Sequence, residues 1–350
     1  MVIEKGGNIK ESGYINFASV ISAISVVFLH ANGCFWNFSA TLRYWRTANI
    51  IECVFYFAVP VFFMISGATL LDFFSRYGLK EYIGRRVQKT VIPYIIWSLL
   101  GLIFRLSYLK DEAEIDWKYI LNGLLKGNLV SIYWFFIPLF CLYLVIPLMA
   151  AVKEELKKKI FVYLTAISFV LNSLLPFVVK VFHVDVNVSL FVVVGNEYML
   201  YLILGYLVHR YEIKRKARLS LYIVGILGLL LHIVGTYRLS LAAGEIVSTY
   251  KGYNNVPCIL YSTAVFVFMK YGWEYLSKVR LADTLIRFLK PYTFSMYLVH
   301  WYILQIIIKE FRVDVRSIYY RIGAPFVVVV VTVAFAWGIK KLPFGKNLLP

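Results

Sequence analysis

The chain has 350 residues, of which 61% are hydrophobic and 18% aromatic, and its mean hydropathy is +0.72. Soluble domains are only about half apolar, so this composition excludes a soluble globular protein and predicts an integral membrane protein. The net charge of +18 raises the alternative of a nucleic-acid partner, which the placement of the charges disfavours.

Ten apolar runs are long enough to cross a bilayer, which takes about 20 predominantly apolar residues. The connections between them are too short for a separate soluble domain with its own core. We therefore predict an all-α integral membrane protein, a bundle of about ten transmembrane helices that forms a single domain over residues 1–350. The predicted spans are 15–35, 53–73, 89–108, 132–151, 159–178, 190–209, 217–236, 256–274, 292–309 and 322–341.

Lysine and arginine are distributed unevenly between the two sides of these spans. With the N-terminus inside, 24 of the 37 lie in the segments that face the cytoplasm or at the adjoining ends of the spans. This asymmetry follows the positive-inside rule and predicts that both termini are cytoplasmic. The positive charge is then a topology signal, reinforced by attraction to anionic lipid headgroups. We expect membrane lipids, and no nucleic acid, among the partners.

Residues 1–14 carry mixed charge, and no small-residue cleavage site follows the first apolar run, so a cleaved signal peptide is not predicted. The four cysteines show no metal-binding spacing, and no metal site is predicted. Cys34 and Cys53 would meet if the first two helices pair on the outer side, but apolar packing is the favoured role. The other two are Cys141 and Cys258.

Ionisable side chains cost at least about 2.5 kcal/mol in a bilayer core, so each one needs a reason. His30, in the stretch "VVFLHANG", falls in the outer half of the first span. A neutral imidazole there can take a proton from a hydroxyl or attack an acyl carbonyl; a histidine satisfied by a neighbouring hydroxyl is the alternative. Glu197, at a similar depth, would hold such an imidazole in one tautomer or contact interfacial water. The other two ionisable residues singled out within the spans are His232 and His300, and His232 is expected to be solvated at the interface.

Two further groups are candidates for binding an acyl donor. The small pair Ser66-Gly67 in the second span admits another helix or a thin ligand, and helix packing is the commoner use. The basic cluster, which consists of Arg85, Arg86 and Lys89, crowds the cytoplasmic mouth of the third span. Arginine grips phosphate through a bidentate fork and lysine as a point charge. Plain positive-inside anchoring is the alternative for this cluster.

Two aromatic residues are candidates for binding a sugar. Tyr133 and Trp134 stand at the outer end of the fourth span, where their rings offer flat faces to a substrate. Aromatic belts place such residues at membrane interfaces without any ligand, so this role depends on what lies beside them.

Six short stretches, in order along the chain, resemble the acyltransferase 3 family of integral-membrane acyltransferases. With the length and the helix number, the resemblance covers essentially the whole chain. It implies a ten-helix bundle in the inner (cytoplasmic) cell membrane that takes an acyl group, usually acetyl, from cytoplasmic acyl-CoA and passes it to a hydroxyl of a surface glycan or its lipid-linked precursor. The stretches are "ISVVFLH", "VPVFFMISGATLL", "RRVQKTVIPYIIW", "YWFFIPLFCLYLVIPLM", "YLILGYLVHR" and "YTFSMYLVH".

The resemblance also assigns roles to residues. The family's catalytic histidine falls on His30, and its basic pair falls on Arg86 and Lys89. Family members generally carry an arginine eleven residues before that histidine, often with an aspartate three residues earlier, and here those places hold Ser19 and Asn16. Because the arginine is thought to position the acyl donor, either the basic cluster suffices, or this member uses another donor or has lost transfer activity.

The predicted function is therefore acyl transfer across the membrane, with acetyl-CoA or another acyl-CoA as co-substrate and no permanently bound cofactor. The CoA phosphates would rest on the basic cluster and the pantetheine would pass near Ser66 and Gly67. His30 would act as general base or carry the acyl group as an acyl-imidazole. The alternative is an exporter or flippase for a surface glycan. A third class, the membrane half of a two-domain amino-acid racemase, resembles the family but has no room for its soluble half.

Overall fold

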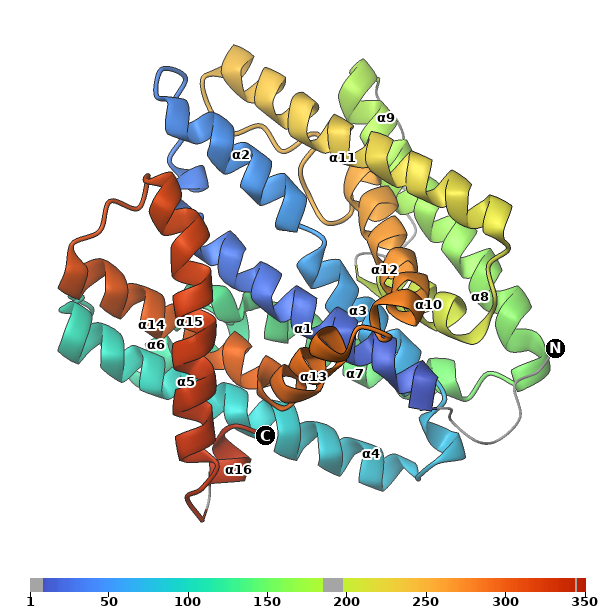
Figure 1. Ribbon diagram of the computed structural model, residues 1–350, viewed down its shortest axis with the longest axis horizontal. Helices are drawn as coiled ribbons and strands as arrows, with labels where there is room; N and C mark the ends of the chain where they lie inside the picture. The colour runs from blue at the N-terminus through green and yellow to red at the C-terminus, as the bar shows by residue number, and fades with distance from the viewer. Residues whose placement is uncertain (1–8, 185–197, 344) are drawn as a thin grey trace.

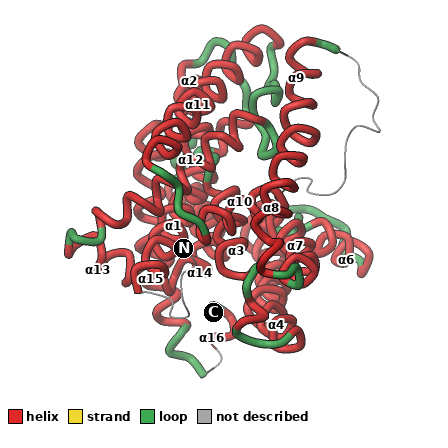
Figure 2. Tube along the Cα trace, turned by 90° about the vertical axis from the view of Figure 1, so that its right-hand side faces the viewer, coloured by secondary structure: helices red, strands yellow, loops and turns green. Residues whose placement is uncertain are grey.

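In the computed structural model, residues 9–184, 198–343 and 345–350 are described, and within these ranges the chain forms helices and loops with no strand (Figures 1 and 2). Short π-helical turns join α4 to α5 and α8 to α9. The α-helices are α1 (Ile9–Ala31), α2 (Arg43–Phe55), α3 (Ala58–Leu70), α4 (Leu79–Arg86), α5 (Ile92–Phe104), α6 (Trp117–Lys126), α7 (Phe136–Ala150), α8 (Glu154–Phe169), α9 (Leu175–Phe182), α10 (Met199–Arg210), α11 (Arg215–Ala243), α12 (Val256–Leu276), α13 (Arg280–Leu289), α14 (Thr293–Phe311), α15 (Ile318–Ile339) and α16 (Gly345–Leu348).

Eight helical segments of the described chain are long and apolar enough to cross a membrane. They coincide with eight of the ten predicted spans. The predicted span 190–209 is described only from residue 198, and its described part overlaps the 12-residue helix α10. The predicted span 292–309 corresponds to α14, a 19-residue helix that is not among the eight. The all-helical membrane architecture is confirmed, whereas ten spans and cytoplasmic termini stay predictions.

The second predicted span, 53–73, is longer than expected and is interrupted. Its apolar segment covers Arg43–Ser75, with a break between α2 and α3. Pro60, in the first turn of α3, has no N–H to offer the carbonyl of Tyr56, so the helical hydrogen-bond ladder stops there. Because α2 begins ten residues before the predicted span, Glu52 lies on a buried helix instead of in a loop.

α1 occupies the middle of the bundle, where it packs against α3, α12, α14 and α15 (Figure 1). Beside it, α3 and α10 approach so closely that side chains would not fit between them. A Cβ at Gly67 would lie 1.8 Å from the carbonyl oxygen of Leu202, and one at Gly205 would lie 2.0 Å from that of Met64. Glycine at both positions permits the backbone contact, as small residues do between membrane helices.

The cysteines take the packing role that the sequence favours. All four are free thiols, so no disulfide joins Cys34 to Cys53. Cys34, Cys53 and Cys258 are buried, while Cys141 is exposed on the surface of α7. Burial raises the pKa of the Cys34 thiol, which keeps it protonated and suited to apolar surroundings.

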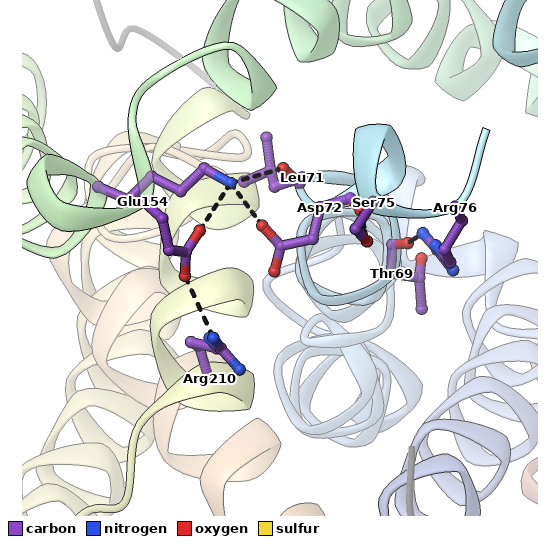
Figure 3. Close-up of polar contacts among 8 residues, drawn as sticks. Thr69, Leu71, Asp72, Ser75, Arg76, Glu154 and Arg210 are labelled. Carbon is purple, nitrogen blue, oxygen red and sulfur yellow. Dashed lines mark hydrogen bonds and ion pairs between the residues drawn. The ribbon is translucent and has the colours of Figure 1, made fainter. Parts of the chain in front are cut away.

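A cluster of ion pairs fastens the end of α3 to α8 and α10 (Figure 3). Lys157 Nζ lies 2.6 Å from Asp72 Oδ1, 3.2 Å from Glu154 Oε2 and 3.4 Å from the carbonyl oxygen of Leu71. Glu154 also accepts from Arg210 at 3.2 Å. We call Lys157, Asp72, Glu154 and Arg210 the Lys157 cluster. The Lys157 side chain is 6% exposed, and each of its three N–H donors has an acceptor within reach.

Candidate active site

A cavity of about 550 Å³ lies between α1, α2, α3, α14 and the segment 131–135. Its volume falls within the range of small-molecule sites, which combine apolar walls with a few polar groups. Most of the lining is aliphatic or aromatic. The polar groups that line the cavity are His30, Glu52, Ser131 and Gln305, with the hydroxyl-bearing rings of Tyr56, Tyr253 and Tyr297.

His30 extends from the last turn of α1 into this cavity. No hydroxyl group among residues 9–184, 198–343 and 345–350 hydrogen-bonds to its ring, so the structural alternative considered for this histidine finds no support there. The nearest ring of another histidine is that of His300 on α14. The two ring centres are 5.1 Å apart and the planes are inclined by 35°. The structure therefore joins two of the four intramembrane ionisable residues found in the sequence.

The cavity also contains a carboxylate that the sequence analysis missed. Glu52 Oε1 lies 3.2 Å from Lys251 Nζ, and the two side chains are only 5% and 3% exposed. The Lys251 ammonium also lies over the rings of Tyr56 and Trp36, 4.1 Å and 4.5 Å from their centres. Burying a charge is costly unless it is paired, and cation–π contacts add further support. Lys251 thus holds Glu52 at the cavity wall.

A second buried cation lies behind the end of α1. Arg321 on α15 is 1% exposed and donates to Thr47 Oγ1 at 2.8 Å and to Asn32 Oδ1 at 3.4 Å. Asn32 in turn donates to the carbonyl of Ala48 at 2.9 Å. Because Asn32 follows His30 by two residues, this network fixes the end of the helix that carries the histidine. The sequence pattern did not mark Arg321 as buried either, because it directly precedes a predicted span.

Aromatic rings form one wall of the cavity. Trp134 stacks on Tyr253 with ring centres 5.6 Å apart, and Tyr253 stacks on Tyr56 at 4.3 Å. Enclosure in this wall raises the pKa of the Tyr253 hydroxyl well above its usual range, so it acts as a neutral hydrogen-bonding group. Of the two predicted sugar-binding residues, Trp134 lines the cavity. Tyr133 is buried and is not part of the lining, and its hydroxyl donates to the carbonyl of Leu298 at 2.6 Å.

The basic cluster stands on α4 and the turn that follows, and none of its members lines the cavity. Its three residues differ in their surroundings. Arg85 is paired with Glu81 at 2.5 Å. The Arg86 guanidinium lies over two aromatic rings, and its buried Nε has no hydrogen-bond partner within the described chain. Lys89 is exposed. Arg86 therefore has an unused donor in a half-buried position.

The remaining predicted site residues lie away from the cavity lining or outside the described chain. The Ser66 hydroxyl donates to a carbonyl of its own helix, and Gly67 faces α10. Ser19, which occupies the place of the family's arginine, is buried and donates to the carbonyl of Ile15 at 2.8 Å. Glu197 lies outside the described residues, so its role stays a prediction.

The expectation for His232 is wrong. Its side chain is fully buried, edge-on to the ring of Tyr56 at 5.2 Å, and not solvated at an interface. The reason is that the loop 244–255 brings Lys251 and Tyr253 over this part of the bundle, next to Tyr56. Within the described residues, no group of three or more metal-ligating side chains is assembled.

Comparison with known proteins gives one family. No curated protein and no solved structure matches the chain. The acyltransferase 3 family, described as an acyltransferase domain, matches residues 12–341, a range that includes His30, His300 and the basic cluster. The match spans nearly the whole chain, and the protein therefore belongs to this family of membrane acyltransferases.

Proposed function

We propose that the protein transfers an acyl group, in the first place acetyl, from cytoplasmic acyl-CoA to a hydroxyl of a surface polysaccharide or its lipid-linked precursor. The observation that carries this proposal is the position of His30. The residue on which the family's catalytic histidine falls lines a cavity of about 550 Å³ together with a carboxylate and an aromatic wall. An exporter would not need a base at the wall of such a cavity.

In the proposed reaction, His30 supplies the proton transfer that acyl transfer requires. As a general base it takes the proton of the acceptor hydroxyl while that oxygen attacks the thioester carbonyl. The carbon–sulfur bond then breaks, and the proton passes to the leaving thiolate. In the alternative route the imidazole attacks first and carries the acyl group until the hydroxyl displaces it. Both routes need one unprotonated ring nitrogen that faces the cavity.

The cavity wall supports a carbohydrate acceptor. Trp134, Tyr253 and Tyr56 stack in a row, and such aromatic faces pack against the apolar face of a sugar ring. The Glu52 carboxylate is an acceptor for sugar hydroxyl groups. Two buried cations, Lys251 and Arg321, lie near the end of α1. Their positive charges favour the negative charge that develops on the carbonyl oxygen during acyl transfer.

Within the basic cluster, Arg86 and Lys89 are the proposed contacts for the CoA phosphates, because Arg85 is already paired with Glu81. Arg86 has a buried Nε without a partner, and Lys89 is exposed beside it. A phosphate would satisfy this orphaned donor through a charge-assisted hydrogen bond. Because the cluster does not line the cavity, the pantetheine arm has to carry the acyl group from the phosphates to His30.

The test uses purified protein in liposomes with acetyl-CoA inside and a glycan acceptor outside. His30→Ala and His30→Gln are compared with His209→Gln, which removes a histidine that contacts Tyr14 and does not line the cavity. We expect both His30 variants to lose at least about 10²-fold in turnover, the contribution of a general base. Full turnover in both would overturn the assignment. Loss of the glycan from the cell surface when the same variants are expressed in cells, with unchanged acetyl-CoA consumption in liposomes, would favour export.

A further inference from the structure

We propose that His300 is a positioning residue for His30. Its unprotonated Nε2 accepts an N–H of the His30 ring, which leaves the other His30 nitrogen bare toward the cavity. This inference rests on the proposed function, in which His30 uses that bare nitrogen as base or nucleophile. It concerns a pair of residues 270 positions apart, brought together by the packing of α1 against α14.

The tautomer of His300 follows from its contacts. Its Nδ1 lies 2.7 Å from the carbonyl oxygen of Met296, one turn earlier on α14. A carbonyl oxygen only accepts hydrogen bonds, so Nδ1 must carry a proton. In a neutral imidazole the other nitrogen is then an acceptor. His300 is fully buried, and the neutral ring therefore presents Nε2 as a bare lone pair inside the protein.

This lone pair needs a donor. Nε2 of His300 is buried and has no hydrogen-bond partner within the described residues, and buried polar atoms are rarely left in that state. The His30 ring centre is 5.1 Å away. An N–H···N hydrogen bond of about 2.9 Å between two imidazoles separates their ring centres by about 5 Å. The two rings are thus already at the required distance, and rotation of the partly exposed His30 ring aligns its N–H with Nε2.

The other ring beside His300 is not an available donor. The centre of the Tyr297 ring lies 6.0 Å from that of His300. Its one hydroxyl proton is engaged by the carbonyl oxygen of Ile132 at 2.6 Å. His30 has an N–H and no partner within the described chain, so it is the neighbour that can satisfy His300.

The hydrogen bond would give His300 the role that a carboxylate has in a catalytic triad, which is to fix the tautomer and orientation of the reacting imidazole. When His30 takes the proton of the acceptor hydroxyl on its bare nitrogen, its other N–H keeps its hydrogen bond to His300 Nε2. That hydrogen bond becomes stronger because the donating ring is now charged. His30 then gives this proton to the thiolate. Throughout the reaction, the Nδ1–H of His300 stays hydrogen-bonded to the carbonyl oxygen of Met296.

A pair of variants separates this role from packing. His300→Gln keeps an oxygen acceptor near the place of Nε2, and His300→Leu keeps much of the volume but removes the acceptor. We expect His300→Leu to lower kcat by about 10- to 100-fold, less than the full general-base contribution, with the KM for acyl-CoA within about twofold of the parent. His300→Gln should recover most of that loss. His209→Gln is the matched control for removal of a histidine remote from the cavity. Equal activity of the Leu and Gln variants would overturn the proposal.

Nitrogen NMR of ¹⁵N-histidine-labelled protein gives a readout that needs no activity. The His30 signals, identified by their loss in His30→Gln, should show one protonated and one bare nitrogen in the parent protein and in His300→Gln. They should show the average of two tautomers in His300→Leu. Averaged signals in the parent, or signals unchanged in His300→Leu, would overturn the proposal. If His30 is not needed for acyl transfer at all, the proposed function fails while these spectra still decide whether His300 orients the ring.

Discussion

The Lys157 cluster and the His30 cavity both place charged or titratable side chains inside the bundle, but they differ in how completely their polar atoms are matched. Lys157 has three donors and three acceptors within reach. In the cavity region, the ring of His30 at the wall has no hydrogen-bond partner among the described residues, and neither does the buried Nε2 of His300 beside it. A matched cluster holds helices together, whereas unmatched atoms at a cavity wall are available to a ligand or a reaction.

The Glu52–Lys251 pair lies between these two extremes. It is buried and paired like Lys157, yet its carboxylate lines the cavity. The comparison therefore predicts that this pair contributes to both stability and activity, that the Lys157 cluster contributes to stability alone, and that unmatched donors contribute to binding.

Replacement of Glu52 should have the largest effect. Glu52→Gln leaves the Lys251 ammonium buried without its counter-charge, and breaking such a pair costs about 3 kcal/mol or more in free energy of unfolding. Thermal melting in detergent measures this loss. The double variant Glu52→Gln/Lys251→Met removes both charges and should recover at least half of it. Acyl transfer should stay low in both variants, by on the order of 10²-fold, because the cavity carboxylate is absent in each. Recovered activity in the double variant would show that Glu52 serves stability alone.

Gly67 should come next. In Gly67→Ala, the new Cβ would lie 1.8 Å from the carbonyl oxygen of Leu202, so α3 and α10 must separate, and overpacking of this kind costs about 1–3 kcal/mol. The neighbouring Ser66→Ala removes a hydroxyl that bonds within its own helix and should change the melting temperature little. A Gly67→Ala variant with normal stability and a raised KM for acyl-CoA would instead favour the predicted passage of the donor at this pair.

Lys157→Met should have a smaller effect on stability and none on chemistry. Loss of the lysine removes hydrogen bonds to Asp72 and Glu154, but these carboxylates are 38% and 54% exposed and regain water. We expect a loss of about 1–2 kcal/mol, at the low end for hydrogen bonds to charged groups. The kcat of the folded fraction should equal that of the parent. A lowered kcat at full folding would break the distinction between the two regions.

The same comparison shows what the sequence could reveal. His30 and His300 stand inside apolar runs, so hydropathy alone marked both as unusual. Glu52 and Arg321 precede predicted spans by one residue, and Lys251 lies in a loop. Predicted spans are placed where charges are absent, so a charged residue at the edge of a span is predicted to be exposed to water. In the structure, tertiary packing buries these residues. Each helix is specified by its own stretch of sequence, so the helical architecture could be predicted. The pairing of His30 with His300, and of Glu52 with Lys251, depends on contacts between segments that are distant in the sequence.

The smallest expected effect distinguishes the members of the basic cluster. Arg86 has an orphaned buried donor, whereas Arg85 is held by Glu81 at 2.5 Å. If unmatched donors serve binding, Arg86→Ala should raise the KM for acyl-CoA by about 3- to 10-fold, which corresponds to about 0.6–1.4 kcal/mol of lost binding. Lys89→Ala should raise it less, since an exposed ammonium contributes a screened charge. Arg85→Ala, the matched control with one fewer positive charge, should stay within about twofold. Equal increases in all three would mean that the cluster acts through its total charge, and that the unmatched Nε of Arg86 is not a phosphate contact.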